Sequence, residues 1–221
     1  MRTSETFKII EIFMSIEGEG VRAGLPTVFV RFAGCNLRCK WCDTAYSYEG
    51  KGTMMSREEI ETVITSFGCN RVSFTGGEPL WRLGYFFIKW FALAHPEIQI
   101  NIETNGSIDI TGCLELENTI ISMDYKCPGS GMNSKMNLKN LQKLRETDVL
   151  KFVVADQKDL NSVVDILEKT NPATKNRYIQ PVFGKIDLEQ LVDFVVKHNH
   201  LDLRLGLQLH KIIWGPDKMG V

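Results

Sequence analysis

Short apolar, β-branched runs recur along the whole chain, and helix-like segments lie between several of them. Runs of this length bounded by turn residues are typical of buried strands. We expect strands at Phe7–Phe13, Thr27–Phe32, Arg71–Phe74, Ile98–Ile102, Thr119–Met123, Val149–Val154, Arg177–Val182 and Leu203–Leu209. We expect helices at Arg57–Phe67, Leu80–Ala94, Leu138–Glu146, Lys158–Lys169 and Leu188–Asn199. Strands joined by helices form a mainly parallel sheet, so the pattern predicts an α/β fold, either an open doubly wound sheet or a barrel.

Length and composition narrow the kind of protein further. With 221 residues, 43% of them hydrophobic, the chain can form one core, and no repeat or linker divides it, so we expect a single domain over residues 1–221. The net charge of -1 gives no basic field, which argues against a direct nucleic-acid partner. No signal segment stands at the N-terminus, and the most apolar stretch is too short to cross a bilayer. We therefore expect a cytoplasmic protein without a membrane partner.

Three of the six cysteines lie close together, directly after the predicted strand Thr27–Phe32. Cys35, Cys39 and Cys42 are separated by three and two residues, so a curling loop can aim their thiolates toward one centre. Such crowding suits a metal centre better than disulfides to distant partners. The other cysteines are scattered, and we expect core or incidental positions for Cys69, Cys113 and Cys127.

The missing fourth ligand decides between kinds of metal centre. A structural zinc site normally has four Cys or His ligands, and no fourth one stands near this loop. An iron-sulfur cluster held by three thiolates leaves one iron open to a substrate or cofactor. We favour the cluster, and a zinc-stabilised binding module remains the alternative that is not an enzyme.

The loop, with Trp41 just before its last cysteine, resembles the cluster motif of the radical S-adenosylmethionine superfamily. The resemblance implies a 4Fe-4S cluster on Cys35, Cys39 and Cys42, with S-adenosylmethionine on the open iron. The reduced cluster would cleave that cofactor to a 5′-deoxyadenosyl radical. Cofactor contacts would include Trp41, Cys42 and Asp43.

Further cofactor contacts are implied at the ends of later strands. Gly76, Gly77 and Glu78 resemble the superfamily's Gly-Gly-Glu-Pro element, which holds the methionine amino group, although a plain strand-to-helix turn has the same composition. For the other positions the alternatives are an Asn-Gly turn after Glu103 and a surface salt bridge between Asp124 and Lys126. The remaining implied contacts are Glu103, Ser122, Asp124, Lys126 and Gln180.

The N-terminal stretch from Glu11 to Gly20 makes the resemblance more specific. It resembles the 7-carboxy-7-deazaguanine synthase family, and matching elements run from Phe7 to about Trp214. The resemblance implies an incomplete (βα)6 barrel of about six parallel strands with an added N-terminal strand, and a homodimer. It also implies a lyase that converts 6-carboxy-5,6,7,8-tetrahydropterin to 7-carboxy-7-deazaguanine plus ammonia, with a flavodoxin-like or other low-potential electron donor. An activase that makes a glycyl radical on a partner protein is the nearest alternative enzyme.

The resemblance also implies a set of substrate and catalytic residues. Glu17, Arg31 and Thr44 would form the catalytic set, with Arg31 on the substrate carboxylate and Thr44 supplying a hydroxyl to Mg²⁺. The family usually has Gln at the position of Glu17, and an ionised Glu accepts hydrogen bonds but does not donate them. A strand-end arginine is alternatively a surface charge, and a histidine such as His210 is alternatively a capped core residue. The implied substrate contacts are Ile16, Glu17, Gly18, Arg31, Thr75, His210 and Pro216.

Overall fold

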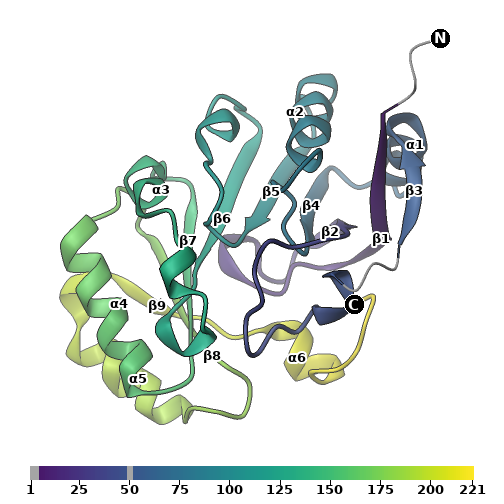
Figure 1. Ribbon diagram of the computed structural model, residues 1–221. Coiled ribbons are helices and arrows are strands. Elements are labelled where there is room, and N and C mark those ends of the chain that lie inside the picture. Colours follow the sequence, from purple (N-terminus) through teal and green to yellow (C-terminus); the bar gives the residue numbers. More distant parts are fainter. Residues whose placement is uncertain (1–4, 49–51) are drawn as a thin grey trace.

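The structure is a computed structural model that describes residues 5–48 and 52–221. In these ranges nine strands form one sheet in the order β3-β1-β2-β4-β5-β6-β7-β8-β9 (Figure 1). The neighbours from β2 to β9 are parallel, whereas β1 is antiparallel to both β2 and β3. The strands are β1 Thr6–Ile16, β2 Pro26–Phe32, β3 Thr53–Ser56, β4 Arg71–Gly76, β5 Gln99–Thr104, β6 Thr119–Tyr125, β7 Val149–Val154, β8 Asn176–Pro181 and β9 Leu203–Leu205.

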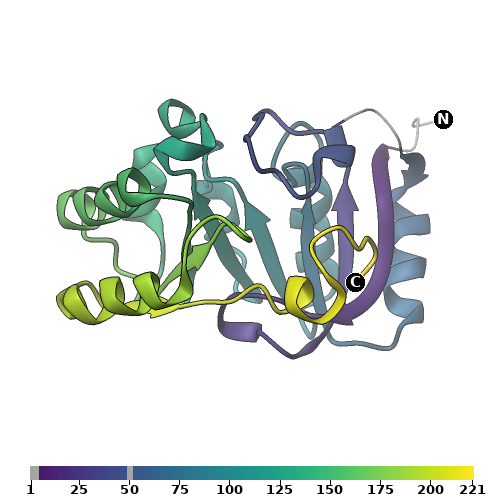
Figure 2. The same ribbon diagram turned by 90° about the horizontal axis from the view of Figure 1, so that it is seen from below.

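Helices follow most of the strands and cover the sheet. The α-helices are α1 Arg57–Ser66, α2 Gly84–Ala94, α3 Leu138–Lys143, α4 Gln157–Thr170, α5 Leu188–Lys197 and α6 Leu209–Trp214. Short 3₁₀ turns stand at η1 Gly20–Arg22, η2 Ala45–Tyr48, η3 Thr111–Cys113, η4 Pro128–Ser130, η5 Asn133–Lys135 and η6 Asn199–Leu201. In Figures 1 and 2, α1 and α2 lie at one end of the curved sheet and α4 and α5 at the other, while α6 and the C-terminal segment lie beside β1 and β2.

The core between the sheet and its helices is rich in aromatic rings. Phe74 of β4 and Phe87 and Phe91 of α2 are fully buried. The Phe74 ring meets the other two edge-on, with centroids 5.8 and 5.6 Å away. Edge-to-face pairs of this kind add roughly 0.5–1.5 kcal/mol each to the burial of the rings. This packing fixes β4, whose carboxyl end carries the paired glycines.

The predicted fold is confirmed as an incomplete barrel with an added antiparallel N-terminal strand, and the sequence reading missed β3 and α6. The predicted strand Leu203–Leu209 is wrong in its second half, because the chain leaves the sheet after Leu205 and enters α6 at Leu209. Alternating leucines imitate a longer strand there. Gly206 ends it, since a Cβ at this position would lie 3.0 Å from the Gln180 side chain.

Two smaller corrections concern helices. The predicted helix Leu80–Ala94 begins only at Gly84, because Glu78 to Leu83 form turns after the strand. The predicted helix Leu138–Glu146 ends at Lys143. The search for membrane-spanning helices found none of sufficient length and apolarity among the described residues.

Candidate functional site

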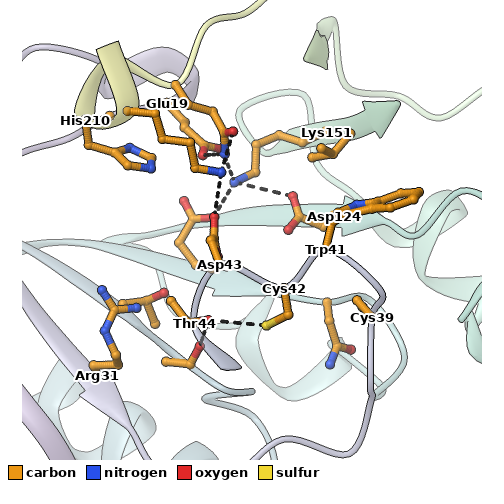
Figure 3. A pocket seen from close by; sticks show the side chains of 18 of the residues that line it. Glu19, Arg31, Cys39, Trp41, Cys42, Asp43, Thr44, Asp124, Lys151 and His210 are labelled. Carbon is orange, nitrogen blue, oxygen red and sulfur yellow. Dashed lines mark hydrogen bonds and ion pairs between the residues drawn. The ribbon is translucent and has the colours of Figure 1, made fainter. Parts of the chain in front are cut away.

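The three clustered cysteines lie on the loop after β2, at the carboxyl end of the parallel strands. Figure 3 shows two of them, Cys39 and Cys42. Cys35, Cys39 and Cys42 are free and half-buried, and all three line one pocket. Leu37 between them is only 3% exposed and anchors the loop in the core. The Cys42 N–H donates to the Cys39 carbonyl at 3.3 Å, which closes a turn. The loop therefore presents thiols to the pocket from a backbone that is itself held in place.

Three thiols on one loop are the ligand set that a 4Fe-4S cluster with one open iron requires. Among the described residues, no group of three His, Cys, Asp or Glu side chains is close enough together to hold one metal ion. A tetrahedral zinc site needs its ligands around one atom, whereas a 4Fe-4S cluster binds each thiolate at a different iron. Three free, half-buried thiols on one loop suit the cluster.

The paired glycines at the end of β4 pack directly against the cysteine loop. A Cβ on Gly76, whose φ is +130°, would lie 2.2 Å from the Phe32 carbonyl oxygen, and one on Gly77 would lie 2.0 Å from that of Gly34. The Gly77 N–H donates to the Phe32 carbonyl at 3.1 Å. Only glycine permits this close approach. The motif predicts that these glycines contact a ligand, and in the structure they also allow the cysteine loop to pack against the end of β4.

The carboxylate of Glu78, another predicted cofactor contact, is buried and is absent from the pocket lining. It accepts hydrogen bonds from the Leu80 N–H at 3.1 Å, the Thr104 hydroxyl at 2.8 Å and the Asn105 N–H at 2.6 Å. Burial raises the pKa of Glu78 to about 7, although these donors oppose the shift. The carboxylate thus joins the turn after β4 to the end of β5.

The pocket beside the loop is a cavity of about 260 Å³ that brings together most of the predicted site residues. The expected residues that line it are Ile16, Glu17, Gly18, Arg31, Cys35, Cys39, Trp41, Cys42, Asp43, Thr44, Thr75, Gly76, Gly77, Glu103, Asp124, Lys126, His210 and Pro216. Three expected cofactor contacts, Glu78, Ser122 and Gln180, are absent from its lining. Both amide atoms of the Gln180 side chain are buried without a hydrogen-bond partner among the described residues.

Lys151 of β7 is the centre of a charged cluster on the wall opposite the cysteines (Figure 3). Its Nζ lies 2.9 Å from Glu19, 2.5 Å from Glu103 and 3.4 Å from Asp124. Lys126 adds an ion pair of 2.9 Å to Asp124. Burial opposes the charged form of Lys151, but the three carboxylates raise its pKa well above its usual value. The lysine is therefore a permanent cation that orders carboxylates from three elements.

The pKa values of two carboxyls in the same segment are shifted in opposite directions. Burial, followed by the charge of Glu103, raises the pKa of Glu17 to about 7. Burial has the same tendency at Glu19, but Lys151 and the hydrogen bond from Gln208 outweigh it and lower the pKa to about 2. Near neutral pH, Glu19 is ionised while Glu17 is at its midpoint.

Arg31 of β2 lies in the pocket wall with one edge of its guanidinium already used. Its Nε donates to the Glu11 carboxylate at 2.7 Å, and the Tyr46 hydroxyl donates to the same oxygen at 3.1 Å. The guanidinium lies 5.9 Å from the Phe13 ring centroid and 5.8 Å from that of Tyr46. Its two terminal nitrogens have no hydrogen-bond partner among the described residues. They are free to bind an anion.

His210 contacts the N-terminal segment from the first turn of α6. The predicted strand Leu203–Leu209 would end directly before this residue, but β9 ends at Leu205. A Cβ on Gly18 would lie 2.4 Å from its Nδ1, so the imidazole packs directly on that glycine. Burial lowers the pKa of His210, which keeps the ring neutral at physiological pH.

A chain of polar contacts joins α6 to both walls of the pocket. Gln208 donates to Glu19 at 2.7 Å, and Lys211 donates to Gln208 at 2.8 Å. The same Lys211 Nζ lies 2.9 Å from Asp43, the residue after Cys42. The sequence reading assigned no role to Glu19, Lys151 or Lys211. A charged residue inside the apolar run Val149–Val154 was the available signal for Lys151.

Comparison with known proteins identifies the family. Residues 29–123 match the family described as the Radical SAM superfamily. A 7-carboxy-7-deazaguanine synthase of Clostridium acetobutylicum is 42% identical over 97% of this chain and 99% of the relative. A protein of the same name from Leptospira interrogans is 37% identical over 96% of this chain and 96% of the relative. One from Chlorobaculum tepidum is 35% identical over the full length of both chains.

The chain belongs to the 7-carboxy-7-deazaguanine synthase family. It is accordingly a radical S-adenosylmethionine lyase, whose cofactors are a 4Fe-4S cluster and S-adenosylmethionine. The crystal structure of QueE from Escherichia coli has the same fold, with a TM-score of 0.70 at 22% identity over 93% of this chain and 95% of that one. Neither the activase nor the zinc-module alternative is supported by these relatives.

Proposed function

We propose that this chain is a 7-carboxy-7-deazaguanine synthase, which contracts the ring of 6-carboxy-5,6,7,8-tetrahydropterin and releases ammonia. One observation carries the proposal: the thiol loop and a wall of carboxylates line the same small pocket. A pterin offers amino and amide N–H groups along one edge, for which carboxylates are the natural acceptors. We propose that the whole chain acts as one domain around this pocket.

Different walls of the pocket would bind the cluster and the substrate. The cluster would be held by Cys35, Cys39 and Cys42. S-adenosylmethionine bound to this cluster would supply a 5′-deoxyadenosyl radical. The terminal guanidinium nitrogens of Arg31 would take the substrate carboxylate in a bidentate pair. Its Nε contact with Glu11 supports this role, because it fixes the orientation of the fork.

Thr44 is the proposed protein ligand of Mg²⁺. Its hydroxyl lies 3.7 Å from the Cys42 sulfur and 3.4 Å from the Gly76 carbonyl, so it stands between the cluster loop and the Gly-Gly turn. Mg²⁺ keeps several waters and needs few protein ligands, which suits one hydroxyl plus a substrate carboxylate. The ion would orient that carboxylate beside Arg31.

The remaining proposed roles follow from position along the pocket. Asp43 and Trp41 flank Cys42. Asp124 lies near the end of β6 and Lys126 directly follows it, which suits contacts with the cofactor's polar groups. For Ser122 and Gln180 a cofactor contact needs a rearrangement, because neither lines the pocket. Ile16, Gly18, Thr75 and Pro216 are proposed to line the substrate's side of the cavity.

Arg38 and Lys40 supply a reason to propose an acidic, flavodoxin-like electron donor. Both are exposed on the outside of the cysteine loop. Residues 33–41 contact residues 128–140 through the Lys40 N–H and the Ser130 carbonyl, and neither segment contains Asp or Glu. A positive surface over the loop would attract an acidic partner and lose that attraction in salt.

A homodimer in the cytoplasm completes the proposal. Ile212 and Ile213 of α6 are 58% and 54% exposed, and Trp214 beside them is 39% exposed. Exposed apolar groups on one short helix suit a protein interface. Sedimentation of an Ile213→Glu variant tests it, and an unchanged dimer would exclude this face.

Product formation tests the reaction itself. Reconstituted enzyme is incubated without oxygen with reductant, S-adenosylmethionine, Mg²⁺ and the carboxytetrahydropterin, and a deazapurine is sought by mass spectrometry. Cleavage of the cofactor without this product would defeat the assignment. Thr44→Ala should blunt the Mg²⁺ response with an unchanged cluster spectrum, whereas Thr44→Ser, which keeps the hydroxyl, should retain it.

A further inference from the structure

Glu17 is a buried carboxyl in a position where its charge is not neutralised. It follows β1, is only 4% exposed, and lines the pocket. Among the described residues it forms no ion pair, because the three contacts of Lys151 go to Glu19, Glu103 and Asp124. Burying an ionised carboxylate without a counter-ion is costly, and such groups usually take up a proton instead.

A second carboxyl stands beside it. The Asn101 amide nitrogen lies 2.7 Å from Glu103 Oε1 and 3.4 Å from Glu17 Oε2, so one donor contacts both side chains. Burial raises the pKa of Glu103 as well, but Lys151 at 2.5 Å opposes that shift and favours the ionised form of Glu103. Of two neighbouring carboxyls, the one without the cation holds the shared proton. That carboxyl is Glu17.

The two oxygens of Glu17 are not equivalent. Oε2 accepts from the Ser73 hydroxyl at 2.6 Å and from Asn101. Oε1 has no hydrogen-bond partner among the described residues. It is not one of the polar atoms that are fully buried without a partner, so it is accessible from the pocket. A proton on Oε1 would therefore point toward a ligand rather than back into the protein.

We propose that Glu17 binds its ligand as a neutral carboxylic acid, donating a hydrogen bond from Oε1 to an acceptor atom such as a carbonyl oxygen or bare ring nitrogen. The inference rests on the proposed function for the identity of that ligand, a pterin. Glu17 would thereby select between ligands. A ligand with an N–H in place of the acceptor atom would place two donors against each other and would bind more weakly. Three other charged groups act on Glu17. Lys151 opposes the rise in its pKa and Glu19 adds to it. Arg22 is the third, and its guanidinium donates to the Gln99 and Ile100 carbonyls.

The pKa of Glu17, raised to about 7 mainly by burial, sets the pH range of the effect. Below neutral pH the carboxyl carries its proton and donates. As the pH rises through 7 the donor is lost, and affinity for the acceptor falls about tenfold per unit above the midpoint. A Gln in its place would donate at every pH.

Carbon NMR of the carboxyl groups tests the protonation without any turnover. Cluster-loaded protein with ¹³C-labelled Glu side-chain carboxyls is titrated from pH 5 to 9, and Glu17 is assigned by the signal that Glu17→Gln removes. We expect a midpoint near 7, and a midpoint at least one unit lower in Glu103→Gln. Glu19, assigned in the same way, is the matched control and should stay ionised throughout. A Glu17 midpoint below 5, or no change in Glu103→Gln, overturns the proposal.

Calorimetry then tests the donor role with the carboxytetrahydropterin as ligand, without oxygen or reductant. Wild-type affinity should fall at least tenfold from pH 6.5 to 8.5, and Glu17→Gln should lose this dependence. A pH-independent wild type, or an unchanged pH profile in Glu17→Gln, contradicts the inference. A neutral Glu17 in a protein that never binds the pterin would defeat the proposed function and leave the protonation state standing, so the two failures are distinguishable.

Discussion

The cysteine wall and the carboxylate wall of the pocket are held by different interactions. Gly34 N–H to Ser47 carbonyl and Gly77 N–H to Phe32 carbonyl, at 2.7 and 3.1 Å, fix the cysteine loop through its main chain. The opposite wall depends on side chains that meet at Lys151. Backbone hydrogen bonds do not titrate, whereas a cluster of carboxylates does. The stability of the cysteine wall should therefore depend on steric fit and on the bound cluster. The stability of the carboxylate wall should depend on pH and salt.

The largest effect is expected from Cys39→Ala. Removing one of three thiolates should abolish the cluster, and turnover should fall about 1000-fold or more, equivalent to roughly 4 kcal/mol in activation free energy. Iron content and visible absorbance of the reconstituted protein give the measurement. Cys69→Ala, at a half-buried cysteine away from the loop, should keep its iron. Full iron in Cys39→Ala would mean that the loop does not hold the cluster.

Lys151→Met tests the carboxylate wall. It leaves Glu19 and Glu103 without their cation, whereas Asp124 keeps its ion pair with Lys126. The unfolding free energy at pH 8 should drop by roughly 3–5 kcal/mol. Without Lys151 the folded-state pKa values of these carboxyls rise. Because Glu19 is ionised in the wild type above a pKa of about 2, the loss should already be present at pH 5 and be larger at pH 8. Urea unfolding at pH 5 and 8 measures this. An equal loss at both pH values, or a similar loss in the exposed control Lys169→Met, would contradict the claim that the charge of Lys151 stabilises the carboxylate wall.

Gly77→Ala tests the cysteine wall by sterics alone. The added methyl group, 2.0 Å from the Gly34 carbonyl oxygen, must push the loop away, at a cost of roughly 2–3 kcal/mol. Unlike Lys151→Met, the cost should be the same at pH 5 and 8. Gly68→Ala, with φ +63° but no atom within 4 Å, should cost only about 1 kcal/mol. A strong pH dependence for Gly77→Ala would contradict the backbone account.

The smallest effect is expected from Lys211→Met, which cuts the link between the walls. The Asp43 side chain is 42% exposed, so water replaces part of the lost ion pair and stability should fall by no more than about 1 kcal/mol. The substrate KM should rise a few-fold while the iron content stays constant, with partial rescue by Lys211→Arg. A changed cluster spectrum would show that α6 supports the cysteine loop itself.

Most of the cysteine wall was predictable because its parts are local in sequence. Cys35 to Thr44 lie on one loop, and the paired glycines end the adjacent strand, so motif and strand order were enough. Glu78 shows the limit of this reasoning. Its motif predicts a ligand contact, and only the structure shows that its carboxylate accepts a hydrogen bond from the Asn105 N–H. Which way a side chain points after a turn depends on packing that no motif encodes.

The sequence by itself determined the α/β order of elements, the three-thiol loop and the family resemblance, because strand periodicity and motif spacing are local properties. Only the tertiary structure decided that Lys151 forms ion pairs with carboxylates from β6, β5 and the N-terminal segment, and that the buried Glu17 has no ion pair of its own among the described residues. The physical reason is distance: a pKa depends on burial and on charges within a few ångströms, and residues 17, 103 and 151 become neighbours only when the sheet closes around the pocket.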